Sequence, residues 1–173
     1  MSTSSSGALP KGRRSVSNIS MEIERKYLVR DLPENLDTYP HVEIEQAYLC
    51  TSPTLRIRRM GDRYILTVKQ HLRVPGTTAI HNREEEFPLA PESYARLRAK
   101  CEGIPVAKTR YRIPLPDGLV VELDIFHGPH APLILAEVEF PSTDAANAFV
   151  PPAWFGPDVS TDPHYRNSYL AQL

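Results

Sequence analysis

The stretch MEIERKYLV, residues 21–29, carries two glutamates and a lysine at alternate positions: Glu22, Glu24 and Lys26. Because successive side chains of a β-strand point to opposite faces, these three side chains share one face of a strand. Such a row is compatible with the wet surface of a sheet. It is equally compatible with the lining of a polar site, and the rest of the chain has to decide between the two.

The same alternation runs through most of the chain and indicates a fold built mainly from antiparallel strands. Helical spacing predicts helices over residues 91–101, over 142–149 with Ser142 or Thr143 as N-cap, and over the C-terminal residues 164–173. Many strands with few helices favour a barrel or a sandwich of the mainly β (α+β) class. Period-two stretches predict eight strands, over residues 21–29, 42–50, 54–60, 63–70, 79–89, 105–114, 118–127 and 133–140.

Bulk composition excludes several classes of partner. The 173 residues carry a net charge of −1, so nothing global indicates a nucleic-acid or membrane-surface binder. Cys50 and Cys101 lack metal or disulfide spacing, which is typical of a reduced, cytoplasmic protein. Residues 1–20 are rich in serine and basic, and we expect a disordered tail or a misassigned start there. Residues 21–173 are then expected to form a single domain.

The charges on the predicted strands are segregated by sign. Pairs of the type ExE or ExD occur on four strands, whereas RxR and KxRxR occur on two others. An antiparallel sheet with one wet face gives the same alternation without any function, and alternation alone favours that explanation. A solvent-facing surface, however, more often mixes the two signs, which argues for a charged interior.

A charged interior of this composition suits a metal–polyphosphate ligand. Carboxylates confined together repel one another, and Mg²⁺ or Mn²⁺ relieves that repulsion by taking oxygen ligands. Facing lysine and arginine side chains bind anions, and the arginine fork matches phosphate oxygens. DNA would instead need an open basic surface.

The ordered series of motifs resembles the CYTH superfamily, also called the triphosphate tunnel metalloenzymes. Its ExExK hallmark matches Glu22, Glu24 and Lys26, and RxR, a lysine, ExE, KxR and a terminal ExE follow in the family's order. The segments EIERKYLV, QAYL, KTRY, ELDIFHG, AEVEF, PPAWFG and YRNSYL are most similar to the short bacterial branch, which includes inorganic triphosphatases. The resemblance implies a CYTH domain over residues 21–173, built as a closed eight-stranded antiparallel β-barrel with a few flanking helices.

The resemblance also implies roles for the charged residues. Tyr48 and Lys108 match a tyrosine–lysine pair that deprotonates the attacking water, since a nearby ammonium group favours the phenolate. The triphosphate would be held by basic side chains: Lys26, Arg56, Arg58, Lys69, Lys108 and Arg110. One or two Mg²⁺ or Mn²⁺ ions would be held by acidic side chains: Glu22, Glu24, Glu137, Glu139, Asp124, Glu122, Glu84 and Glu86.

The activity that the resemblance implies is metal-dependent hydrolysis of inorganic triphosphate to pyrophosphate and phosphate. Three alternatives stay open: class IV adenylyl cyclase-like chemistry, hydrolysis of a nucleoside or thiamine triphosphate, and a non-catalytic polyphosphate-binding module. The expected partner is inorganic triphosphate or another small molecule with a triphosphate group. A homodimer is possible, and neither nucleic acid nor a membrane is expected.

Some positions depart from the family's pattern. Where an arginine usually precedes ExE by two residues, this chain has Asn82, followed by Arg83. Either Arg83 faces outward or the strand is shifted by one residue, which would bring Glu85 inside in place of Glu84 and Glu86.

The C-terminal segment and one loop differ from the family as well. His164 stands where the family has an arginine, and Arg166 is the residue able to replace it. Residues 71–82 are predicted to form an unusually long loop. Four other histidines show no metal spacing and are predicted to lie in loops: His71, His81, His127 and His130.

Overall fold

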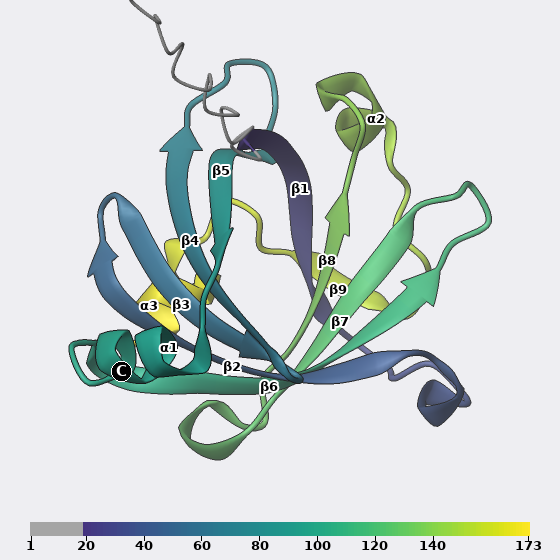
Figure 1. The fold of residues 1–173 in the computed structure, drawn as a ribbon. Coiled ribbons are helices and arrows are strands. Elements are labelled where there is room, and N and C mark those ends of the chain that lie inside the picture. Colours follow the sequence, from purple (N-terminus) through teal and green to yellow (C-terminus); the bar gives the residue numbers. More distant parts are fainter. Residues whose placement is uncertain (1–18) are drawn as a thin grey trace, which may run out of the picture.

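The computed structural model describes residues 19–173, whose strands form an antiparallel sheet that closes on itself (Figure 1). Neighbouring strands follow the order β5-β4-β3-β2-β6-β7-β8-β1, and β1 pairs again with β5, so eight strands complete a barrel. The predicted closed eight-stranded barrel is confirmed. The strands are β1 (Ile19–Val29), β2 (His41–Thr51), β3 (Thr54–Met60), β4 (Arg63–Leu72), β5 (Ile80–Pro88), β6 (Glu102–Pro114), β7 (Val120–Phe126), β8 (Ile134–Glu139) and β9 (Phe155–Asp158).

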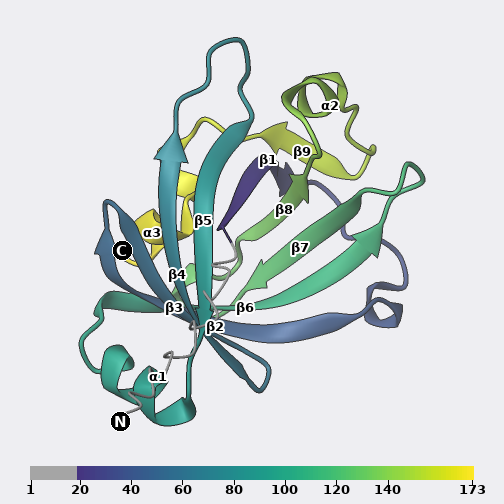
Figure 2. The same cartoon turned by 45° about the horizontal axis from the view of Figure 1, so that its top comes forward.

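Short helices flank the barrel (Figures 1 and 2). Tyr94 of α1 packs on the outer face of β2 and β3. The helix α2 begins after its N-cap residue Ser142, whose Oγ accepts a 3.1 Å hydrogen bond from the Ala145 amide. None of the helices in residues 19–173 is long and apolar enough to cross a membrane. The helices are α1 (Pro91–Arg98), α2 (Thr143–Ala148) and α3 (Asn167–Leu170), with 3-10 turns η1 (Leu36–Thr38), η2 (Gly128–His130) and η3 (Pro163–Tyr165).

The hydrophobic core lies between the barrel wall and the outer elements. Val121, Leu123 and Val138 are fully buried, and each occupies a position that alternates with a charged one. They belong to a cluster that also holds Phe155 of β9 and Ala146 of α2. Because the outer elements cover the apolar side of the wall, the charged side is left facing the barrel interior.

The C-terminal segment differs from the prediction. Residues 155–158 form β9, which pairs with β1, although Gly156 and Pro157 give the segment no alternation. A Cβ atom at Gly156 would lie 3.1 Å from the carbonyl oxygen of Leu28, so glycine permits this close approach. The helix predicted over 164–173 is reduced to α3, because the extended backbone of Arg166 (φ −74°, ψ 136°) separates it from the 3-10 turn η3.

The segment between β4 and β5 is shorter than predicted. His71 lies in β4, and His81 lies in β5 with its side chain buried, so their prediction as loop residues was wrong. Strand pairing continues as far as Leu72 opposite His81, which leaves only residues 73–79 as the loop. His127 and His130 do lie in the connection between β7 and β8, as predicted.

Candidate active site

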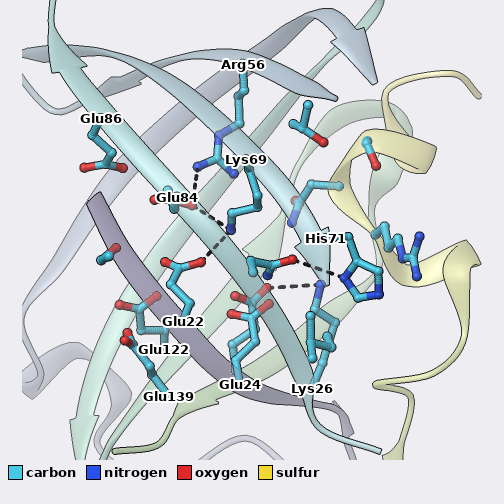
Figure 3. Close-up of a pocket in the computed structure, with 18 of the residues that line it drawn as sticks. Glu22, Glu24, Lys26, Arg56, Lys69, His71, Glu84, Glu86, Glu122 and Glu139 are labelled. Atoms are coloured by element: carbon cyan, nitrogen blue, oxygen red, sulfur yellow. Dashed lines mark hydrogen bonds and ion pairs between the residues drawn. The ribbon is translucent and has the colours of Figure 1, made fainter. Parts of the chain in front are cut away.

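The charged side of the wall lines an elongated cavity of about 1430 Å³ inside the barrel (Figure 3). Glu22, Glu24 and Lys26, which alternate along residues 21–29, therefore face an internal site. Two of the predicted residues, Lys108 and Asp124, do not line the cavity, because both side chains are 0 % exposed. The predicted residues that line it are Glu22, Glu24, Lys26, Tyr48, Arg56, Arg58, Lys69, Glu84, Glu86, Arg110, Glu122, Glu137 and Glu139.

Lys69 lies between two carboxylates from different strands. Its Nζ is 2.9 Å from Oε2 of Glu22 on β1 and 2.8 Å from Oε2 of Glu84 on β5 (Figure 3). Burial disfavours the charged amine, but the attraction of these and other carboxylates raises the pKa of Lys69 above its ordinary value. Burial also opposes ionisation of Glu84, yet Lys69 and Arg56 lower the pKa of its carboxyl to about 2. Lys69 and Glu84 are therefore both ionised near neutral pH and form an ion pair inside the tunnel.

In a second group of carboxylates, neighbouring cations offset less of the negative charge. Glu24 lies opposite Glu139 in the pairing of β1 with β8. Burial and the charge of Glu137 raise the pKa of Glu24, and burial with Glu122 and Glu24 raises that of Glu139. Burial likewise raises the pKa of Glu22 despite its contact with Lys69. These carboxylates thus ionise reluctantly and would gain from a nearby cation.

The donor set fits a hard divalent cation, because Mg²⁺ and Mn²⁺ prefer carboxylate and water oxygens. Oε1 of Glu137 is buried without a hydrogen bond in the described residues, and Nζ of Lys26 is 3.5 Å away. Within residues 19–173, however, no three acidic, histidine or cysteine side chains converge into a ready metal site. Lys69 accounts for part of this, because its amine separates Glu22 from Glu84.

Basic side chains enter the cavity from several strands. Nζ of Lys26 donates to the carbonyl oxygen of Tyr165 at 3.2 Å. Nη2 of Arg56 donates to Thr67 Oγ1 at 3.4 Å and lies 3.9 Å from Glu84, while Arg58 sits beside it on the same face of β3. Burial and the neighbouring charge of Arg56 lower the pKa of Arg58 to about 10, so it remains cationic near neutral pH. Crowded guanidinium groups of this kind favour an anionic ligand.

Arg110 is held by a buried ion-pair network on the inner face of β6 and β7. Its Nε and Nη2 donate to the carboxylate of Asp124 at 2.6 and 2.7 Å, and its Nη1 donates to Glu122. Nζ of Lys108 is 2.5 Å from Asp124 Oδ2, and it also donates to Asn167 Oδ1 at 3.4 Å. Although burial opposes it, the two cations lower the pKa of Asp124, whereas burial lowers that of Lys108 to about 8. Asp124 therefore serves as the shared counter-ion of two cations.

The hydroxyl of Tyr48 is held by residues other than Lys108. Nε2 of Gln46 donates to it at 2.9 Å, and Arg56 lies opposite Tyr48 in the register of β2 and β3. Lys108 pairs instead with Ile44, four residues away along β2, which is about 13 Å of strand. Among residues 19–173, Lys108 makes its side-chain hydrogen bonds to Asp124 and Asn167, and none joins it to the Tyr48 hydroxyl.

The register of β5 settles which of its glutamates face the tunnel. Glu84 lies opposite the inward Lys69, and Glu86 also lines the cavity. Glu85 instead lies opposite Val68, so the one-residue shift does not occur, and Arg83 is exposed on the outside. Asn82 occupies the inward position where the family usually has arginine.

Several polar residues of the cavity carry no strong sequence signal. Asn82 Oδ1 is 3.2 Å from Nδ1 of His71, and both side chains line the wall. Arg166, Asn167 and Ser168 reach the cavity from the C-terminal segment. His164 does not line it, which leaves Arg166 as the C-terminal arginine of the site. The buried amide of Gln46 was missed as well, because an uncharged residue does not stand out in a pattern of charges.

Comparison with known proteins gives consistent matches. The family model of the CYTH domain matches residues 20–147. The inorganic triphosphatase of Nitrosomonas europaea is 42% identical over 154 residues, which cover 87% of this chain and 96% of the relative. The inorganic triphosphatase of Acetivibrio thermocellus is 33% identical over 159 residues, which cover 87% and 93%. The crystal structure of the inorganic triphosphatase NE1496 is similar with a TM-score of 0.65 and 40% identity, over 88% of this chain and 95% of that one.

Proposed function

The chain belongs to the CYTH domain family, and from that membership we propose that it hydrolyses inorganic triphosphate to pyrophosphate and phosphate inside its charged tunnel. The observation that carries the proposal is the lining of the cavity. Guanidinium and ammonium groups from β1, β3, β4 and β6 face carboxylates from β1, β5, β7 and β8 around one enclosed space. Such a lining binds a small polyanion together with divalent cations.

In this proposal Lys26, Arg56, Arg58 and Arg110 bind the phosphate oxygens. Their charges neutralise the substrate and the negative charge that grows on the leaving pyrophosphate. Arg110 keeps its direction because Asp124 and Glu122 anchor its guanidinium. Lys108 shares Asp124 with Arg110, so we propose that it stabilises this anchor from its buried position beside the cavity.

Glu22, Glu24, Glu137 and Glu139 are the residues that would hold Mg²⁺ or Mn²⁺. Such an ion would supply neutralisation of the phosphate charge and activation of water. Lys69 would share the task of balancing these carboxylates, since its amine already contacts Glu22 and lies near Glu24.

Tyr48 is the residue that we propose as general base. Water attacks the terminal phosphorus, its proton passes to the phenolate oxygen of Tyr48, and the bond to the bridging oxygen breaks to release pyrophosphate. Tyr48 is suited to this role because it lines the cavity beside Arg56, a residue expected to bind phosphate.

The proposal is tested by phosphate release from inorganic triphosphate, ATP and thiamine triphosphate, each with Mg²⁺, with Mn²⁺ and with a chelator. We expect metal-dependent release that is fastest with inorganic triphosphate. Faster release from ATP or thiamine triphosphate would identify an organic triphosphate as the substrate. Conversion of ATP to a cyclic nucleotide and pyrophosphate would indicate a cyclase. Tight binding of triphosphate without turnover would indicate a binding module.

A matched pair of arginine variants tests the location of the site. Arg56→Gln should lower kcat/KM for triphosphate by about 100-fold, the usual effect of losing one donor to developing charge. Arg59→Gln, on the same strand but exposed on the outer face, should leave kcat/KM unchanged. Equal effects of the two substitutions would place the site outside the tunnel.

A further inference from the structure

Gln46 is a fully buried polar side chain that connects two residues of the tunnel wall. Its exposed fraction is 0 %. Its Oε1 accepts a 3.1 Å hydrogen bond from Nε of Arg58, and its Nε2 donates a 2.9 Å hydrogen bond to the hydroxyl of Tyr48. Arg58 and Gln46 are directly opposite each other in the register of β3 and β2, and Tyr48 is two residues further along the same face of β2. The link is therefore set by strand pairing.

The partners of Gln46 fix the orientation of its amide. A guanidinium group has no acceptor, so only the carbonyl oxygen of Gln46 can face Arg58. The NH₂ group must then face Tyr48, and because an amide NH₂ only donates, the phenol oxygen must accept. The reversed amide would place two donors against each other in a fully buried position, which is costly.

The other groups around the Tyr48 hydroxyl point in the same direction. On β3, Arg56 lies opposite Tyr48; burial opposes its charge, but contact with the Tyr48 hydroxyl helps to raise the pKa of the guanidinium. On β6, the backbone neighbour of Tyr48 is Glu102, whose side chain is exposed. Tyr165 of η3 packs against the same apolar cluster as Tyr48. The charged groups nearest the hydroxyl are thus cations.

We propose that Gln46 is a positioning residue for the water-activation step: its amide, itself fixed by Arg58, holds the Tyr48 oxygen as a hydrogen-bond acceptor. The inference rests on the proposed function, in which Tyr48 takes the proton from water. The hydrogen bond from Gln46 and the positive charge of Arg56 stabilise the phenolate over the phenol. Because no hydrogen bond joins Lys108 to Tyr48 in the described residues, Gln46 and Arg56 take the place of the lysine as the groups that activate Tyr48.

The hydrogen bond can be tested without any assay of activity. The full-length protein is labelled with [¹³Cζ]tyrosine, and the Tyr48 signal is assigned among the eight tyrosines as the one lost in Tyr48→Phe. In Gln46→Leu the pH midpoint of this signal should rise by about one unit relative to the parent protein, the equivalent of one ordinary hydrogen bond. In Gln46→Glu the rise should be larger, because a carboxylate cannot donate.

Two control variants distinguish the loss of the Gln46 hydrogen bond from a general disturbance of side-chain packing. Thr109→Val removes another buried hydroxyl on the outer side of β6, where it bonds Glu43, and should leave the Tyr48 signal unchanged. Gln46→Met keeps the side-chain length without an amide, and it replaces Gln46→Leu if thermal unfolding shows that the leucine variant does not fold. An unchanged Tyr48 midpoint in both Gln46→Glu and the apolar variant would overturn the inference.

Kinetics with triphosphate complete the test. We expect the apolar variant to lose kcat at neutral pH, to keep its KM, and to recover part of kcat at alkaline pH as the phenolate forms. A loss of kcat by the same factor at every pH would show that Gln46 supports the fold and does not position Tyr48 for proton transfer. Failure of the parent protein to hydrolyse triphosphate would remove the proposed function, yet the shifted ¹³C midpoint would still establish the hydrogen bond.

Discussion

At the scale of single residues, Lys69 explains how the tunnel tolerates its carboxylates. Its amine contacts Glu22 and Glu84 from two different strands. We expect Lys69→Met to lower the melting temperature in the presence of chelator, because removing one partner leaves buried charges uncompensated. We also expect Mn²⁺ to raise the melting temperature of this variant more than that of the parent protein, since the ion would supply the missing charge.

The control for this prediction is a lysine outside the tunnel. Lys100 is exposed after α1, and Lys100→Met should leave both the stability and the response to Mn²⁺ unchanged. Identical Mn²⁺ responses of Lys69→Met and the parent protein would show that Lys69 and the metal ion do not share the same carboxylates.

Tyr48→Phe removes only the hydroxyl that we propose as the base. Turnover of triphosphate should fall by about 100-fold or more, the usual contribution of a general base. Triphosphate binding, measured by calorimetry, should stay within a few-fold of the parent value because the arginines are untouched. A variant that turns over at the parent rate would assign proton transfer to another group.

Glu84 gives a prediction about pH. Its carboxyl pKa of about 2 in the folded chain lies below the ordinary value of 4.5, so ionised Glu84 stabilises the fold. This stabilisation is fully present above pH 4.5 and is lost as the pH falls toward 2. The melting temperature of Glu84→Gln should therefore lie below that of the parent protein at pH 7, and the gap should narrow between pH 4.5 and 2. A gap that is constant with pH would contradict the ion pair with Lys69.

Most charged residues of the site were predictable because strand periodicity and sign segregation place them on one face. What the pattern could not give is contact between strands. The register puts Lys108 opposite Ile44, where it bonds Asp124 in place of Tyr48, and it buries Asp124 between two cations. Gln46 has no charge, so only its burial and its two hydrogen bonds reveal it.

At the scale of elements, all eight strands of the barrel were predictable, because most of them alternate between polar and apolar positions and turn residues separate several of them. The terminal elements were not. The strand β9 contains Gly156 and Pro157 and forms because β1 offers it an edge. The turn η3 and helix α3 depend on tertiary contacts, such as the 2.6 Å hydrogen bond between His130 Nε2 and the Leu170 carbonyl.

A pair of glycines tests the packing of α3 on the barrel. Gly103 has φ +74°, and a Cβ atom there would lie 2.1 Å from the carbonyl oxygen of Ala171, just after α3. Gly118 has φ +83° and nothing within 4 Å. Gly118→Ala should cost about 1 kcal/mol from left-handed strain alone, as measured by denaturant unfolding.

Gly103→Ala should cost clearly more, because the alanine must also displace the end of the chain from the barrel. Triphosphate turnover should fall in this variant as well, since Tyr165 and Asn167 contact Lys26 and Lys108. Equal destabilisation by the two substitutions would show that the C-terminal segment contributes nothing to the stability of the barrel.

At the scale of the whole molecule, the fold reverses the usual arrangement of a small barrel. The apolar side chains of the wall face outward and are covered by α1, α2, β9 and the C-terminal segment, so the interior can be charged. Ion pairs between neighbouring strands of the tunnel wall offset part of the repulsion in the free protein. A polyanion with divalent cations would complete the balance of charge.

The most direct test of this account is a ³¹P NMR time course of inorganic triphosphate with the purified chain and Mg²⁺ or Mn²⁺. The account predicts that the triphosphate signals disappear while pyrophosphate and phosphate appear in equal amounts, and that a chelator stops the reaction. Triphosphate that stays intact with both metal ions, while the protein is folded, would contradict hydrolysis in the tunnel.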